Sequence, residues 1–186
     1  MVECKNLLAI IEELAQDAKQ VDNDQLAKIE ELILQAKRVF IVGAGRSGFA
    51  ARAFSNRLMH LGFDSNFVGE PTTPSIRKGD LLIIGSGSGK TESLVTMAKK
   101  AKSEGALLAT VTIHPENTIG SMADAYIRIP GISSREEAVE KAPSVQPNGS
   151  SFEQLSWLVY DSMVDDLKKA TKQEQADIDY RQPNME

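Results

Sequence analysis

A short apolar run that leads directly into a loop of glycine and serine constrains the fold of this chain most strongly. Residues 79–91 read GDLLIIGSGSGKT, and the apolar residues 81–84 have the composition of a buried strand. The glycines let the backbone turn and approach a ligand closely, and hydroxyl side chains stand beside the start of a predicted helix. Because the free amides of a helix N-terminus attract negative charge, this serine loop predicts an anion site.

The end of the serine loop resembles a nucleotide-triphosphate P-loop, but its spacing rejects that motif. Gly89, Lys90 and Thr91 match the last three positions of a P-loop. The motif also needs a glycine five residues before Gly89, where Ile84 stands inside the predicted strand. The sequence therefore favours a monophosphate site over a nucleotide site.

Apolar strands alternate with helix-length segments from residue 38 onward. The predicted strands cover 39–43, about 65–69, 80–85, 106–113 and 125–130, and the helices between them cover 47–61, 91–104 and 117–123. This alternation is typical of a parallel sheet with helices on both faces. We therefore predict an α/β fold of three layers, flavodoxin-like, with a five-stranded parallel sheet. Ligands of such sheets bind at the carboxyl ends of the strands, where the glycine-rich loops fall.

The rest of the chain is predicted to flank this core within one domain, residues 1–186. Helices fill residues 1–36, the second of them after Asp22, and the α/β core covers 37–170. Polar residues 131–150 predict an irregular loop, and the tail 171–186 is expected to be mobile or to pack only on a partner chain. A final helix, 151–169, is predicted to bury five apolar side chains: Phe152, Leu155, Val159, Met163 and Leu167.

Composition excludes several classes of protein. The net charge of -5 disfavours nucleic acid or an anionic membrane as the main partner. The single cysteine, Cys4, has no partner for an internal disulfide, and no apolar run approaches membrane-spanning length, so we expect a cytoplasmic protein. With only two histidines, a multi-histidine metal site is not expected.

A second glycine loop, GAGRSG from Gly43 to Gly48, follows the first predicted strand and matches the dinucleotide fingerprint. Glu70, near the end of the next strand, is a passable ribose ligand, so spacing alone leaves a nicotinamide enzyme open. Such an enzyme does not require a hydroxyl-rich loop on the neighbouring strand. Arg46 and Ser47 are candidates to bind the phosphate or a sugar oxygen, against a surface salt bridge and a helix cap as their ordinary roles.

The two loops together resemble the sugar isomerase (SIS) domain, a family of phosphosugar-binding proteins. The stretches RLMHLGF, VGEPTTP, GDLLIIGSGSG-x-T and QPNGS-x-FEQ resemble, within that family, the 6-phospho-3-hexuloisomerases over nearly the whole chain. Lys90 departs from the pattern, because the resemblance leads us to expect an acidic residue there. Its positive charge lies beside the predicted phosphate site and is not expected to disturb the loop.

The resemblance implies reversible conversion of D-arabino-3-hexulose 6-phosphate to fructose 6-phosphate, in the ribulose monophosphate pathway, without metal or organic cofactor. It also implies a homotetramer with sites near subunit boundaries and functional coupling to 3-hexulose-6-phosphate synthase. The runner-up class is a non-catalytic SIS module that senses a sugar phosphate; the sequence shows no helix-turn-helix segment, which favours the enzyme. The expected substrate-binding residues are Gly45, Arg46, Ser47, Ser86, Gly87, Ser88, Gly89 and Thr91.

Proton transfer between C2 and C3 of the sugar requires a base, for which Glu153 is the candidate. Spacing alone makes Ser150-x-x-Glu153 a capping box, with the glutamate reaching back to a backbone amide. The resemblance gives Glu153 the catalytic role instead, and both roles stay open in alternate rotamers. His60, in RLMHLGF, is the favoured acid or base for opening the fructose ring, in a neighbouring subunit's site; His114 is the reserve candidate, and an ordinary structural role is the alternative for both.

Overall fold

Five parallel strands form the centre of the molecule. The computed structural model describes residues 2–133 and 144–185. The strand order is β2-β1-β3-β4-β5, and every neighbouring pair is parallel. This is the order of flavodoxin-like sheets, so the predicted fold class is confirmed. The strands are β1 (Val39–Gly43), β2 (Ser65–Phe67), β3 (Leu81–Gly85), β4 (Leu107–Thr112) and β5 (Ala125–Arg128).

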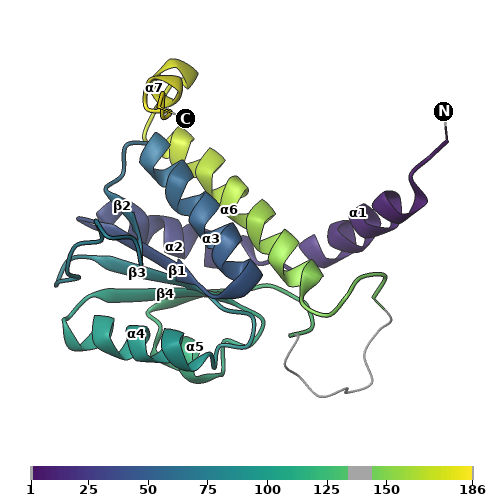
Figure 1. Cartoon of the computed structure of the whole chain (residues 1–186), viewed down its shortest axis with the longest axis horizontal. Coiled ribbons are helices and arrows are strands. Elements are labelled where there is room, and N and C mark those ends of the chain that lie inside the picture. The colour runs from purple at the N-terminus through teal and green to yellow at the C-terminus, as the bar shows by residue number, and fades with distance from the viewer. Residues whose placement is uncertain (1, 134–143, 186) are drawn as a thin grey trace.

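Helices cover both faces of the sheet and complete three layers (Figure 1). One layer contains α2 (Asn23–Gln35), α3 (Gly45–His60) and α6 (Ser150–Ala170); the other contains α4 (Glu92–Ser103) and α5 (Thr118–Met122). Successive side chains of a strand point to opposite faces, and the two layers bury alternate residues of β1 and β3. Both faces are therefore apolar, which explains why these strands have continuous apolar sequences.

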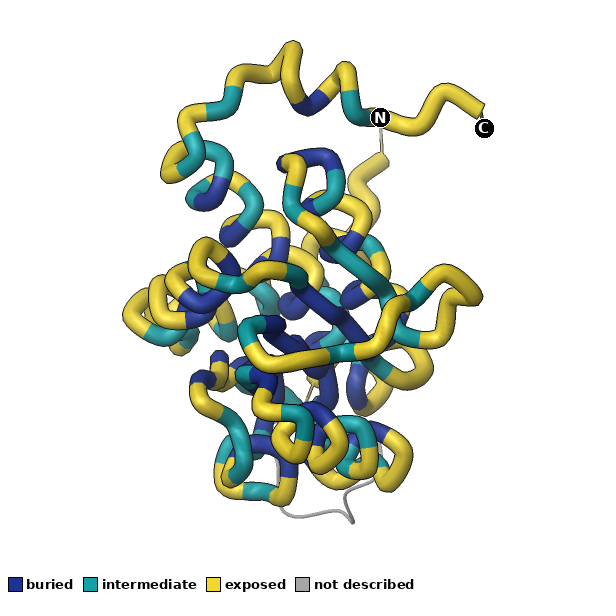
Figure 2. Tube along the Cα trace, turned by 90° about the vertical axis from the view of Figure 1, so that its left-hand side faces the viewer, coloured by how far each residue is buried: buried dark blue, intermediate teal, exposed yellow. Residues whose placement is uncertain are grey.

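The core positions predicted from helical spacing in α2 and α6 are buried. Helix α2 begins after Asp22, whose carboxylate accepts a hydrogen bond from the Asp24 amide at 2.9 Å. Figure 2 shows that buried positions follow the central strands and the inner sides of the helices. All five predicted core positions of α6 are buried: Phe152, Leu155, Val159, Met163 and Leu167.

The first helix differs from the others because it projects away from the sheet (Figure 1). Helix α1 (Lys5–Ala18) has no buried residue, and Leu7, Leu8 and Ile11 are each about half exposed. Its Glu13 carboxylate accepts hydrogen bonds from the hydroxyl of Ser144 at 2.8 Å and from the next amide at 2.9 Å. Helix α1 therefore contacts the segment that leads into α6.

The prediction that the tail is mobile or packs only on a partner is wrong. Helix α7 (Gln175–Tyr180) follows α6, and Ile178 packs into the core of the same chain with 8% exposure. Arg181 donates to the carbonyl of His60 at 3.2 Å and to the side chain of Gln173 at 2.7 Å. A reciprocal capping box between Glu174 and Asp177 starts this helix.

The loop predicted over 131–150 lies in large part, from 134 to 143, outside the described residues. Its described parts, 131–133 and 144–149, contain no helix or strand. Among the helices of residues 2–133 and 144–185, none is long and apolar enough to span a bilayer.

Candidate functional site

The two glycine loops meet at one place, the carboxyl ends of the neighbouring strands β1 and β3. The strand order reverses between these strands, and open parallel sheets bind ligands at such a switch point. A cavity of about 270 Å³ lies here, closed on its third side by the start of α6. Eight of the predicted site residues line it: Gly45, Arg46, Ser47, Ser86, Gly87, Ser88, Thr91 and Glu153.

Three helices begin in the wall of this cavity. Their N-cap residues are Ala44 for α3, Thr91 for α4 and Gly149 for α6, and in the described structure none of the three side chains caps its helix. The first amides of α3 and α4 therefore keep their capacity to donate to a ligand, whereas in α6 the Ser150 amide donates to the Pro147 carbonyl at 3.1 Å. Because the three helix dipoles add positive potential at the same point, the cavity favours an anion such as phosphate.

The serine loop, residues 85–91, presents further donors to the cavity. Ser86 accepts a hydrogen bond at its hydroxyl oxygen from the Gly89 amide at 3.2 Å, and Ser88 accepts one from the Lys90 amide at 3.3 Å. Each hydroxyl keeps its own proton for a further acceptor. Within residues 2–133 and 144–185, the amides of Gly87 and Ser88 donate no hydrogen bond. The loop therefore offers both hydroxyl and amide donors.

Gly89, predicted to bind substrate, belongs to the serine loop but does not line the cavity. Its φ of +62° favours glycine, and an added Cβ would lie 3.3 Å from Asn117 Cβ and from the His114 carbonyl oxygen. Gly89 therefore allows the turn of the loop and its close packing against residues 114–117.

The fingerprint glycines of the first loop serve close packing. A Cβ on Gly43 would lie 2.9 Å from the Gly48 Cα atom, and a Cβ on Gly48 would lie 2.8 Å from the Gly43 carbonyl oxygen. Only glycine at both positions lets α3 begin directly against the end of β1. This contact brings the N-terminus of α3 to the cavity.

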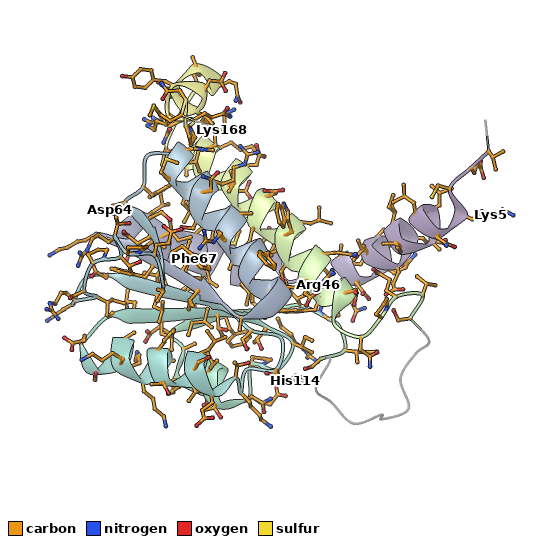
Figure 3. The ribbon with its side chains drawn as sticks, viewed as in Figure 1. Lys5, Arg46, Asp64, Phe67, His114 and Lys168 are labelled. Carbon is orange, nitrogen blue, oxygen red and sulfur yellow. The ribbon has the colours of Figure 1, made fainter. Side chains whose placement is uncertain are left out.

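An ion pair joins two walls of the cavity. The guanidinium Nε of Arg46 donates a hydrogen bond to the Glu153 carboxylate, across the neighbouring helices α3 and α6. The Arg46 side chain is 64% exposed, whereas that of Glu153 is 19% exposed. Figure 3 shows Arg46 beside the start of α6. The pair therefore holds a largely covered carboxylate against an accessible cation.

The capping box predicted from spacing is wrong. The N-cap of α6 is Gly149, with φ +90°, so Ser150 is already the first helical residue. Glycine adopts this left-handed conformation without a steric penalty. The Glu153 side chain contacts Arg46 and does not cap the start of α6.

The two histidines lie in different places. His60 is at the far end of α3, 5% exposed, beside a separate surface hollow. At 1.5 Å rise per residue, it stands about 21 Å along the helix from Arg46. His114 follows β4 at the end of the molecule that holds Arg46 (Figure 3), with its ring Nδ1 3.0 Å from Glu116. Neither histidine lines the cavity.

The model of the SIS domain family matches residues 32–146. The chain belongs to this family. It is 44% identical over 155 residues to the 3-hexulose-6-phosphate isomerase of Bacillus subtilis, with 83% of each chain covered. It is 38% identical over 181 residues to the enzyme of that name from Mycobacterium gastri, with 97% of this chain and 90% of the relative covered.

A solved structure agrees with these relatives. It is that of a hypothetical protein from Methanococcus jannaschii, for which the function of a 3-hexulose-6-phosphate isomerase was inferred. The two structures superpose with a TM-score of 0.75 at 36% identity, and the match covers 98% of this chain and 96% of the other. The SIS family predicted from the two loops is confirmed.

The SIS cavity also contains residues that sequence reasoning did not assign to it. Leu94, Ile113, Ile132, Ser133 and Phe152 line it as well. Four of these are apolar. The sequence pattern of an apolar residue at the end of an element is the same whether its side chain faces the core or a ligand. Phe152 was predicted as core; it is 2% exposed and also lines the cavity.

Beneath the cavity floor, Tyr160 is 2% exposed and stacks on Phe54 with ring centroids 4.6 Å apart. Burial raises the pKa of its phenol well above the usual range. A Cβ on Gly85, which lines the SIS cavity, would lie 3.0 Å from the phenol oxygen. Glycine at the end of β3 therefore leaves room for the Tyr160 phenol, in addition to lining the cavity.

Proposed function

We propose that this SIS chain is a 3-hexulose-6-phosphate isomerase, which interconverts D-arabino-3-hexulose 6-phosphate and fructose 6-phosphate. The single observation that carries the proposal is a carboxylate, Glu153, in the wall of a cavity where three uncapped helix N-termini converge. The donors suit the phosphate and the carboxylate suits the proton transfer. Relatives of this name at 38–44% identity support the same reaction.

The phosphate binds at the serine loop and the start of α4, through loop amides and the hydroxyls of Ser86, Ser88 and Thr91. This contact fixes the sugar chain relative to Glu153, and such positioning replaces a large entropic barrier. Gly45 and Ser47, at the start of α3, donate to sugar oxygens. The reacting carbons then lie between the first loop and α6.

Glu153 removes the proton from C2, and the electron pair of that C–H bond forms the C2–C3 double bond. The C3 carbonyl oxygen takes the negative charge, which gives an enediolate. Glu153 then returns its proton to C3, while the C2 hydroxyl proton moves to the C3 oxygen and C2 becomes the ketone. A carboxylate so placed contributes about 100- to 10,000-fold to the rate.

Arg46 supplies the charge that stabilises the enediolate. Its guanidinium contacts the Glu153 carboxylate and is accessible from the cavity. When Glu153 accepts the C2 proton, it becomes neutral and the oxyanion of the sugar becomes the better partner for the cation. A donor aimed at the atom where charge develops lowers the barrier because it strengthens its contact in the transition state.

One assay tests the proposal directly. The protein is incubated with fructose 6-phosphate, without added metal or cofactor, and the 3-ketose is followed by ¹³C NMR. Coupling to 3-hexulose-6-phosphate synthase, the proposed functional partner, releases formaldehyde and gives a second readout. Tight binding of fructose 6-phosphate without turnover would identify a sensor in place of an enzyme.

The role proposed for His60 needs a second copy of the chain, because His60 lies about 21 Å along α3 from Arg46. In a homotetramer, the ring-opening histidine comes from a neighbour. The half-exposed apolar residues of α1, together with Phe49 at 70% and Trp157 at 45% exposure, give such an assembly apolar surface to bury. A monodisperse monomer in light scattering at working concentration would rule out this assembly.

We also propose that the protein works in the cytoplasm.

A further inference from the structure

Asn117 occupies a helix-cap position but does not cap its helix. It is the N-cap of α5, and asparagine is among the residues most favoured there. Its side chain instead donates from Nδ2 to the carbonyl oxygen of Ser88, at 2.9 Å and 29 residues away in sequence. A residue that breaks a local rule in this way is expected to serve another contact.

The segment from Thr112 to Ile119 binds three successive carbonyls of the serine loop from behind. The Gly87 carbonyl accepts from the Thr112 hydroxyl and from the Ile113 amide, each at 3.2 Å. The Gly89 carbonyl accepts from the Ile119 amide at 3.0 Å. The Ser88 carbonyl between them is held by the Asn117 side chain.

These bonds determine which way the peptide planes of the loop face. In a trans peptide the carbonyl and the following amide point in opposite directions. The bond from Thr112 to the Gly87 carbonyl therefore turns the Ser88 amide the other way, toward the cavity that Ser88 lines. The bond from Asn117 likewise turns the Gly89 amide onto Ser86, where it donates to the carbonyl and the hydroxyl oxygen at 3.2 Å each.

Without these bonds the loop has a competing conformation. Gly87 and Gly89 flank Ser88, and glycines allow a peptide plane to rotate with little steric resistance. A rotated plane would present a carbonyl oxygen, which carries partial negative charge, to the bound phosphate. The anion would then face a repulsive dipole, and rotation of the Gly87–Ser88 plane would also remove the Ser88 amide as a donor.

We propose that Thr112 and Asn117 are positioning residues, which hold the serine loop with the Ser88 amide toward the phosphate and the Gly87 and Ser88 carbonyls away from it. The inference rests on the proposed function for the presence of the phosphate. It assigns to β4 and α5, which supply no catalytic group, control over how tightly the substrate binds. Asn117 sets the Ser88–Gly89 peptide, and Thr112 sets the Gly87–Ser88 peptide.

The decisive variant is Asn117→Ser. Serine is neutral and caps a helix as well as asparagine does, but its side chain is too short to reach the Ser88 carbonyl. Asn117→Asp is the companion, since aspartate also caps well but has no proton to donate. Ser121→Ala is the matched control, because that hydroxyl bonds to the Thr118 carbonyl within α5 and not to the loop.

The probe is inorganic phosphate, measured by calorimetric titration, followed by KM and kcat with fructose 6-phosphate. The loss of one hydrogen bond predicts a rise of about three- to tenfold in the phosphate Kd and in KM for Asn117→Ser. Asn117→Asp should raise both at least as much, and kcat and Tm should stay near the wild-type values. Thr112→Val is expected to act in the same direction, and Ser121→Ala should change neither constant.

A wild-type phosphate Kd and KM in Asn117→Ser would overturn the inference. A fall in Tm with the same loss of affinity in Ser121→Ala would also overturn it, because the residue would then only stabilise the fold. A wild-type protein that binds phosphate but does not isomerise would remove the proposed function and leave the phosphate titration as the test. If neither phosphate nor fructose 6-phosphate binds the wild-type protein, both proposals fail.

Discussion

The substitution Glu153→Gln tests the proposed chemistry with little disturbance of the structure. Glutamine has the same length, and its carbonyl oxygen still accepts the hydrogen bond from Arg46. The start of α6 is not disturbed, because its N-cap is Gly149. The variant loses the capacity to accept the C2 proton and little else.

The expected magnitude follows from the role. A positioned general base contributes about 100- to 10,000-fold, so kcat should fall by that factor, which is about 2.7–5.5 kcal/mol in activation free energy. Stability should change by less than about 1 kcal/mol, since an ion pair with one exposed partner contributes little. KM for fructose 6-phosphate should stay within a few-fold, because the phosphate contacts are unchanged.

The assay is turnover of fructose 6-phosphate in deuterated water, with exchange at C3 followed by NMR. Exchange and turnover should vanish together. The control is Glu70→Gln, because Glu70 forms an ion pair with Arg52 at 3.0 Å and does not line the cavity. If Glu153→Gln turns over at the wild-type rate, the reasoning is refuted.

Three further outcomes are expected. Ser88→Ala should weaken phosphate binding by a few-fold to about a hundredfold in calorimetry, since a hydrogen bond to a charged group contributes about 1.5–3 kcal/mol; unchanged binding would remove Ser88 from the site. Gly85→Ala should lower the free energy of unfolding by about 1–3 kcal/mol in denaturant titration, because its Cβ would lie 3.0 Å from the Tyr160 oxygen, and adding Tyr160→Phe should restore part of the loss. In alkaline spectrophotometric titration, the buried Tyr160 should ionise only on unfolding. Because burial raises the pKa of Tyr160 above the value of about 10 in the unfolded chain, its contribution to stability is complete below pH 10 and is lost as the pH rises further.

The sequence predicted the fold well where the signal was local. The strands before each glycine loop and the inner face of α6 follow from apolar spacing alone, and both lie where expected. The capping box failed because the spacing of Ser150 and Glu153 is the same whether the cap is Ser150 or Gly149. The contact that decides between them comes from Arg46, 107 residues earlier in the chain.

The same limit applies to the tail and to the loop contacts. Helix α7 has only six residues, and it depends on Ile178 packing against the core and on Arg181 reaching the end of α3. The side chain of Asn117 satisfies the rules for a cap, so no local pattern points to its contact with Ser88. Contacts between residues far apart in sequence can be identified only when the arrangement of the segments in space is known. The roles proposed for the site residues are still predictions, and so is the assignment of residues 1–186 to a single domain.

The convergence of three helix starts on one cavity has a consequence for how the protein tolerates change. Main-chain amides do not titrate, so affinity for the anion should follow the ionisation of the ligand and not that of the protein. They also belong to every residue type except proline. Sequence drift can therefore exchange side chains around the loops while the binding surface persists. Only changes that alter the path of the backbone should abolish it.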